Sequence, residues 1–240
     1  MKLWWFISVS LLCSTLTAQT EGRTRYVEGQ RLEQANQIQA ARRAYLGAIK
    51  ADPTLLEARF SLASLYRRDE IYDSAVWYFE SVLALNARHL KAHQELAAVY
   101  QLQGNFDKAI SQYKLMLQHH PGYPQGYYGL AQTYFAQEQY QQAVFNSETA
   151  MRLYSEMGSQ ENAADARMLA AQGYFQQGDY DTALKYLKAS KKYYEDKAYY
   201  PYYIGFCYLG LGEMDKARTY FAQAEVMGYK LPAYITERLK

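Results

Sequence analysis

A small residue recurs along this chain at a fixed spacing of 34 positions. Six alanines share one phase, once an insertion of six residues before the fifth is allowed for. They are Ala41, Ala75, Ala109, Ala143, Ala183 and Ala217. A period of this length is typical of chains built from stacked copies of one helix-turn-helix unit. The spacing therefore predicts a repeat architecture in which each unit packs on its neighbours.

Two further positions keep this phase. Twelve residues before each alanine stands a residue with at most a methyl side chain: Gly29, Ala63, Ala97, Ala131, Ala171 and Gly205. Nine residues before it stands a large apolar residue: Leu32, Tyr66, Tyr100, Tyr134, Tyr174 and Tyr208. Small residues at facing points allow two antiparallel helices to approach closely, and the large side chain fills the space that remains. Each repeat is therefore predicted to be a helical hairpin.

The turn inside each hairpin carries its own signals. Residue types that tolerate the left-handed backbone conformation stand where the first helix must end: Asn36, Gly104, Gly178 and Gly212. An aspartate lies two residues before the alanine in four repeats: Asp73, Asp107, Asp181 and Asp215. We expect these carboxylates to accept hydrogen bonds from the free amides that open the second helix. The core residues, the predicted helix ends and the aspartates thus all indicate the same register of the repeat.

These features resemble those of the tetratricopeptide repeat (TPR) proteins. The resemblance implies an all-α fold, a right-handed α-solenoid of about six TPR units with a short C-terminal capping helix at 230–240. It places a TPR array at 19–229, with repeats near 22–55, 56–89, 90–123, 124–157, 164–197 and 198–229 and an insertion near 158–163. The insertion could lengthen helices or form a loop. Gly158 and Ser159 favour a break there, with Ser159 as the cap of the next helix.

The first eighteen residues have a different pattern. Lys2 gives a positive start, residues 3–12 form an apolar run of ten, and Ala18 precedes a polar segment. Such a run is too short to cross about 30 Å of hydrocarbon as a helix, and the pattern is typical of a secretory signal peptide. We expect 1–18 to be removed and the mature chain to have no integral membrane span. A retained membrane anchor is the alternative.

Cys13 leaves a lipid-anchored form open. Bacterial lipoproteins are cut just before a cysteine that then carries lipid, but their pattern has a small residue where this chain has Leu12. If the signal peptide is removed, Cys207 is the one remaining cysteine and no internal disulfide can form. We expect Cys207 to be a small buried apolar residue.

Charge gives no indication of a nucleic-acid or anionic-membrane partner. The 26 Lys and Arg and 24 Asp and Glu residues are interspersed and leave a net charge of +2. Binding to either partner usually requires a concentrated basic surface. We therefore expect the partner to be a protein or peptide.

The best candidate for a metal site is the pair His89 and His93, with His119 and His120 one repeat later. Two imidazoles four residues apart on a helix can share a metal ion. His93, however, stands where the repeat usually has a large core side chain, and no carboxylate or cysteine completes the site. A phosphate-binding loop, a serine elbow and a CxxC motif are also missing from the sequence. We expect no metal, no cofactor and no enzyme activity, and keep metal binding at His89 and His93 as an alternative.

The first helix of each TPR unit lines the inner groove of the array, by resemblance to the family. Counting from the small residue of that helix gives the predicted groove residues of repeats four to six: Tyr128, Gln132, Phe135, Met168, Gln172, Phe175, Tyr199, Tyr202 and Phe206. The equivalent positions of repeats one to three are more polar: Tyr26, Gln30, Glu33, Phe60, Ser64, Arg67, Gln94, Ala98 and Gln101. A contiguous apolar strip rimmed by glutamine is suited to a peptide or helix. The alternative is that the insertion and the C-terminal tail cover this strip.

Some TPR proteins hold a C-terminal carboxylate with a lysine and an asparagine in this groove, and repeats one to three have neither at the matching positions. The resemblance therefore implies a non-enzymatic interaction scaffold that holds its partner through aromatic side chains, and we expect it to act in the bacterial cell envelope. A periplasmic location follows from the predicted signal peptide. The alternatives are a secreted protein, or an outer-membrane lipoprotein that acts as an assembly factor for outer-membrane proteins or a pilus secretin.

Overall fold

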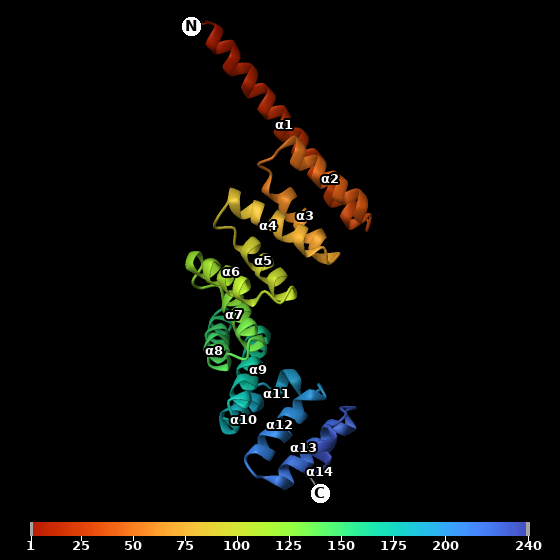
Figure 1. The fold of residues 1–240 in the computed structure, drawn as a ribbon, viewed down its shortest axis with the longest axis vertical. Coiled ribbons are helices and arrows are strands. Elements are labelled where there is room, and N and C mark those ends of the chain that lie inside the picture. The colour runs from red at the N-terminus through yellow and green to blue at the C-terminus, as the bar shows by residue number, and fades with distance from the viewer. Residues whose placement is uncertain (1, 239–240) are drawn as a thin grey trace. The chain divides into compact units, whose positions relative to one another are not determined.

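The computed structural model describes the backbone of residues 2–238 and the side chains of residues 16–238. Within that range the chain is helical, with no strand (Figure 1). The side chain of Cys13, most side chains of the predicted signal peptide at 1–18, and residues 239–240 of the predicted capping helix lie outside the described residues. Cleavage and lipidation therefore stay predictions.

The helices form two compact units, residues 1–119 and 120–240. The first unit contains α1 (Lys2–Gln34), α2 (Ile38–Ala51), α3 (Leu56–Arg68), α4 (Tyr72–Leu85), α5 (Leu90–Leu102) and α6 (Phe106–His119). The second contains α7 (Pro124–Ala136), α8 (Tyr140–Glu156), α9 (Gln160–Gln176), α10 (Tyr180–Ala189), α11 (Lys191–Tyr194), α12 (Tyr199–Gly210), α13 (Met214–Val226) and α14 (Ala233–Arg238). In each unit successive helices pair as antiparallel hairpins that stack on the next hairpin. The predicted all-α fold of solenoid type is confirmed.

The predicted helix crossings are present in every repeat. All six phase-defining alanines have no exposed surface. Gly29 explains why the facing position must be small, because a Cβ there would lie 2.5 Å from Cε1 of Tyr45 on the second helix. Gly205 stands in the same relation to Phe221, whose Cδ1 would be 2.9 Å away. The small residue and the bulky residue across the hairpin thus form one close-packed pair.

The turns between paired helices use the left-handed conformation. The four predicted residues have positive φ, from 56° at Asn36 to 79° at Gly178. Glu70 and Glu138 take the same conformation in repeats two and four, with φ of 59° and 60°. Residue type did not indicate these two positions, because glutamate does not favour the left-handed region. The turn is therefore dictated by the hairpin, even where the residue type opposes it.

The predicted aspartate caps were wrong. Asp73, Asp107, Asp181 and Asp215 lie inside the first turn of the second helix, one position beyond its first residue. There they stabilise the helix through its dipole, because the N-cap position is two residues earlier. Asp179 does cap α10, and accepts from the amide of Thr182 at 3.1 Å. Ser159 stands at the N-cap of α9 as predicted, but its side chain makes no capping bond.

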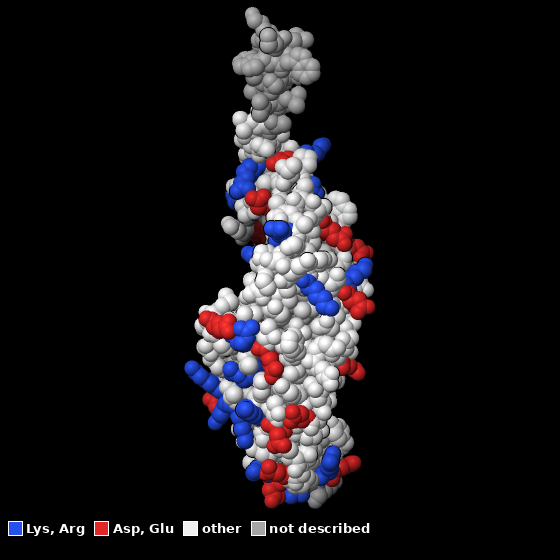
Figure 2. Space-filling view, turned by 90° about the vertical axis from the view of Figure 1, so that its left-hand side faces the viewer, with Lys and Arg blue, Asp and Glu red and all other residues white. Residues whose placement is uncertain are grey.

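The insertion lengthens two helices. Both α8 and α9 have 17 residues, compared with 13 in α7, and Gly158 turns the chain between them with φ of 75°. At the C-terminus Ile235 of α14 is fully buried in the cluster that contains Phe221. Within the part of the chain that is described, no helix is both long and apolar enough to span a bilayer. On the face shown in Figure 2, basic and acidic side chains are intermingled.

Candidate functional site

The second unit contains a cavity of about 520 Å³. Its walls come mainly from α7, α9 and α12, the first helices of repeats four to six, with further side chains from α11 and the segment after α13. The residues that line it are Tyr128, Gln132, Asp165, Met168, Leu169, Gln172, Tyr194, Tyr199, Tyr203 and Tyr229. The repeat therefore brings side chains that are about 70 residues apart in the sequence to one hollow.

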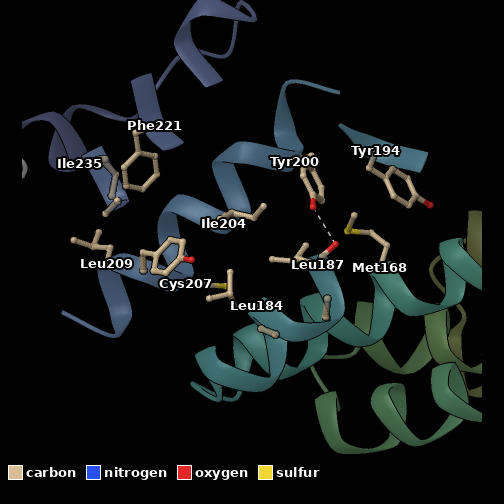
Figure 3. Close-up of a cluster of buried hydrophobic side chains, with 14 of the residues drawn as sticks. Met168, Leu184, Leu187, Tyr194, Tyr200, Ile204, Cys207, Leu209, Phe221 and Ile235 are labelled. Carbon is tan, nitrogen blue, oxygen red and sulfur yellow. Dashed lines mark hydrogen bonds between the residues drawn. The ribbon is translucent and has the colours of Figure 1, made fainter. Parts of the chain in front are cut away.

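Five of the nine predicted groove residues line this cavity: Tyr128, Gln132, Met168, Gln172 and Tyr199. They meet there because each is on the inner face of the first helix of its repeat. Met168 differs from the prediction in one respect, since it is only 6% exposed and belongs to the buried cluster of this unit. Figure 3 shows it beside Tyr194 at one end of that cluster. Met168 is part of the cavity wall and not an exposed anchor.

The other four predicted residues do not line the cavity. Phe175, Tyr202 and Phe206 form one aromatic cluster, with ring centroids 5.8 Å apart for Phe175 and Phe206 and 4.8 Å apart for Tyr202 and Phe206. Tyr229, in the segment after α13, lies over Tyr202 at 4.2 Å. Phe135 instead packs against Tyr140 at 5.4 Å. Tyr229 thus covers part of the predicted strip, and the cavity is a part that stays open.

Asp165 is the acidic group of the cavity. Its carboxylate accepts a hydrogen bond from the hydroxyl of Tyr194 on the connecting helix α11. Burial, and then the Asp165 carboxylate, raise the pKa of Tyr128. Burial raises the pKa of Tyr199 and Tyr203 as well. The phenols are therefore neutral over the whole physiological range, and they offer ring faces and hydroxyl groups but no charge.

Four lining residues were not predicted as site residues: Asp165, Tyr194, Tyr203 and Tyr229. Asp165 had a signal, because it precedes Ala183 by the same 18 positions that separate Tyr199 from Ala217. Tyr194 and Tyr229 had none. They lie after the second helices of repeats five and six, beyond the positions that counting from the alanine marks, so counting did not bring them to the site.

The histidine pair has a structural explanation. His89 is the N-cap of α5, and its Nδ1 accepts from the amide of Ala92 at 3.1 Å. His93 is 4% exposed, with its ring nitrogens 2.8 Å from Oε1 of Gln112 and 3.0 Å from the carbonyl oxygen of Ala87. Three of the four ring nitrogens are thus engaged within the protein, which opposes the metal alternative. Across the described residues, no group of three or more His, Cys, Asp or Glu side chains is arranged to hold a metal ion.

Cys207 is a core residue, as predicted. It has no exposed surface, and burial raises the pKa of its thiol to about 12. The thiol is therefore protonated at neutral pH, and only a thiolate is a good nucleophile or metal ligand. Its environment agrees with packing and gives no basis for reactivity.

Comparison with protein families places repeats along both units. Two tetratricopeptide repeat models match residues 26–93 and 101–145. A third family model, that of the anaphase-promoting complex, cyclosome, subunit 3, matches residues 143–224. A search of curated proteins gave no significant match.

Solved structures resemble this fold at low sequence identity. A crystal structure of MamA is 22% identical, with 70% of this chain and 94% of that chain covered and a TM-score of 0.63. The pilF protein of Pseudomonas aeruginosa is 16% identical, with 88% and 93% covered and a TM-score of 0.69. YrrB, described as a TPR protein with an unusual peptide-binding site, is 20% identical, with 77% and 92% covered and a TM-score of 0.65. These similarities show a common fold.

Proposed function

Because this chain contains tetratricopeptide repeats, we propose that it is a non-enzymatic interaction scaffold that holds a segment of a protein partner at the cavity of its second unit. The observation that carries this proposal is the convergence of five predicted groove positions, from three repeats, on one hollow. Tyrosine rings supply large and rigid contact areas at low cost in side-chain entropy. A volume of about 520 Å³ is within the range of ligand pockets. It suits a side chain of the partner better than a whole helix.

The chemistry of the cavity favours binding over catalysis. General acid–base catalysis needs a group whose pKa is close to the working pH. The described lining residues include one carboxylate and no histidine, cysteine, serine or lysine, and burial moves the pKa of Tyr128 and Tyr199 further from neutrality. A base and a nucleophile are therefore not paired there.

The envelope location is proposed from the N-terminal sequence. The basic start and short apolar run at 1–18 support export, with the periplasm as the destination. The mass of the N-terminal peptide of the mature protein distinguishes removal of a signal peptide from lipidation of Cys13. Loss of 18 residues supports the soluble scaffold, whereas lipid on Cys13 favours the alternative of an anchored assembly factor. An intact N-terminus would refute both.

Affinity capture tests the binding proposal. The protein is immobilised and exposed to an envelope extract of its source cell, and retained proteins are identified by mass spectrometry. Tyr128→Ala and Tyr199→Ala are expected to lose a partner that the unaltered chain retains. Tyr26→Ala is the matched control, because Tyr26 has the same phase in repeat one as Tyr128 in repeat four. Equal retention by all four proteins would show that the cavity is not the binding site.

A further inference from the structure

The cavity of the second unit combines aromatic faces with a single negative charge. We infer that it receives the guanidinium group of an arginine side chain carried by the protein partner. This inference rests on the proposed function and deepens it, because it states which chemistry of the partner the cavity recognises. Three features support it: the lack of a cation partner for Asp165 among the described residues, the number of tyrosine rings in the cavity, and the two glutamine side chains that also line it.

Asp165 has no cation partner of its own. Its one hydrogen bond comes from the neutral hydroxyl of Tyr194, and among residues 16–238 no lysine or arginine forms an ion pair with it. The nearby cations are engaged elsewhere. Arg167 on the same helix donates to the carbonyl of Ala189 at 3.4 Å, and Lys197 pairs with Asp196 at 2.8 Å. A carboxylate in a partly buried cavity is stabilised by an incoming cation.

Five tyrosines surround the cavity: Tyr128, Tyr194, Tyr199, Tyr203 and Tyr229. The face of an aromatic ring carries partial negative charge, so it attracts a cation placed over it. Burial raises the pKa of Tyr128, Tyr199 and Tyr203, so these three rings attract a cation through their faces while Asp165 supplies the negative charge. Among the described lining residues none is basic, and the cavity therefore selects positive charge.

The side chains at the rim favour guanidinium over ammonium. Gln132 is exposed and Gln172 half-buried, and both line the cavity with Asp165. Their amide oxygens are acceptors. A guanidinium group has five donors in one plane, so it can stack on tyrosine and still bond to a carboxylate and to amides at its edge. An ammonium group is more strongly hydrated and has three donors, so it would leave more of the acceptors and ring faces of the cavity without a contact.

The test uses the full chain and a small probe in place of the unknown partner. The methionine methyl groups are labelled with ¹³C, and Nα-acetyl-arginine amide is titrated to millimolar concentration. We expect a saturable shift of the Met168 methyl signal, assigned with Met168→Leu, and no shift of Met116 in the first unit. Nα-acetyl-citrulline amide, the neutral isostere, should bind at least about tenfold more weakly. Equal binding of citrulline, or of the lysine amide, would overturn the assignment to guanidinium.

Variants distinguish the effect of the Asp165 charge from a structural role of this residue. Asp165→Asn should weaken arginine-amide binding at least about tenfold, and Asp181→Asn, at an exposed site outside the cavity, should not change it. Tyr194→Phe removes the hydroxyl bond but leaves the carboxylate and the ring, so it should retain binding. If Tyr194→Phe lost binding as fully as Asp165→Asn, the effect of Asp165 would be structural and the inference wrong. If arginine amide does not bind but Tyr128→Ala still abolishes capture of the protein partner, the guanidinium inference is wrong and the proposed function still holds.

Discussion

The two units use the same hairpin but complete its inner face differently. Eight residues before the phase-defining alanine, the first unit has Glu33, Arg67 and Gln101. Glu33 and Gln101 accept hydrogen bonds from the hydroxyls of Tyr45 at 2.6 Å and Tyr113 at 3.1 Å, whereas Arg67 faces Phe79. Each tyrosine lies four residues after the alanine, across the hairpin. In the second unit the position before the alanine holds Phe135, Phe175 and Leu209, and the position after it holds Ser147, Leu187 and Phe221.

This contrast shows one constraint on the polarity of the inner face. A buried phenol needs an acceptor, so a tyrosine on the second helix requires a polar residue on the first. Where the second helix supplies leucine or phenylalanine, the first can be aromatic, and Phe175 then packs on Tyr203 and Phe206. An aromatic inner face is thus no evidence of binding by itself. The cavity, which combines the Asp165 carboxylate with five tyrosine rings, is the feature that distinguishes the second unit.

Truncation of the bulky residue across the crossing should give the largest effect. Phe79 in the first unit and Phe221 in the second are both fully buried. Phe79→Ala and Phe221→Ala should each lower the free energy of unfolding by about 3–5 kcal/mol, since each leaves a cavity. Urea denaturation followed by circular dichroism measures both. A cost below about 1 kcal/mol for one of them would break the claim that the two units pack alike.

Overpacking the crossing should cost somewhat less. Ala109→Leu and Ala183→Leu place a large side chain where the two helices touch, at positions with no exposed surface. We expect each to lower the free energy of unfolding by about 1–3 kcal/mol. The same denaturation experiment applies, with Ala136→Leu on the exposed end of α7 as a control that should change little. Unchanged stability of either crossing variant would mean that its alanine does not define the crossing.

The polar pair of the first unit can be exchanged for the apolar pair of the second. Tyr45→Phe leaves Glu33 without its donor, and Glu33→Leu leaves a buried phenol without its acceptor. Each single change should cost about 1–2 kcal/mol of unfolding free energy. The double variant should recover part of that loss, because it reproduces the all-apolar pairing of the second unit. Strictly additive losses would show that the two positions are not coupled across the hairpin.

The helix caps should give the smallest effect, and it depends on pH. His89 caps α5 in the first unit, and Asp179 caps α10 in the second. Burial lowers the pKa of His89 in the folded chain, so the unfolded chain binds the proton first as pH falls. The stability from a neutral His89 is therefore complete above about pH 6.5 and is lost as pH falls through the lowered folded pKa. The loss should be about 1 kcal/mol or less.

His89→Asn tests this directly. Asparagine keeps a capping acceptor but does not titrate, so the fall in unfolding free energy between pH 7 and pH 5 should become shallower. Asp179→Asn changes the matching cap of the second unit and leaves the His89 side chain in place, so it should leave the slope over this interval unchanged. An identical slope for His89→Asn and the unaltered chain would assign the pH dependence to other groups.

Counting from one alanine was enough to predict much of the fold. The 34-residue period predicted the helical hairpins, the buried helix crossings and the left-handed residues that end the first helices, because these features depend on residues near each other in sequence. The cap prediction was wrong by two positions, since the aspartate at Asp73 reflects the helix dipole and not the end of the helix. In the candidate site, the same count from the alanines predicted Tyr128 and Tyr199 as groove residues. Extending the count by one helical turn would have predicted Asp165 as well.

The repeat pattern was enough to establish that this chain is a series of helical hairpins with small residues at the crossings. Which part of the inner face stays open depends on tertiary contacts. Tyr194 donates to Asp165 from 29 positions away, and Tyr229, after α13, covers Tyr202. Both lie after the second helices of their repeats, beyond the positions that the period marks. Exposure is a property of distant contacts, so a local pattern cannot fix it.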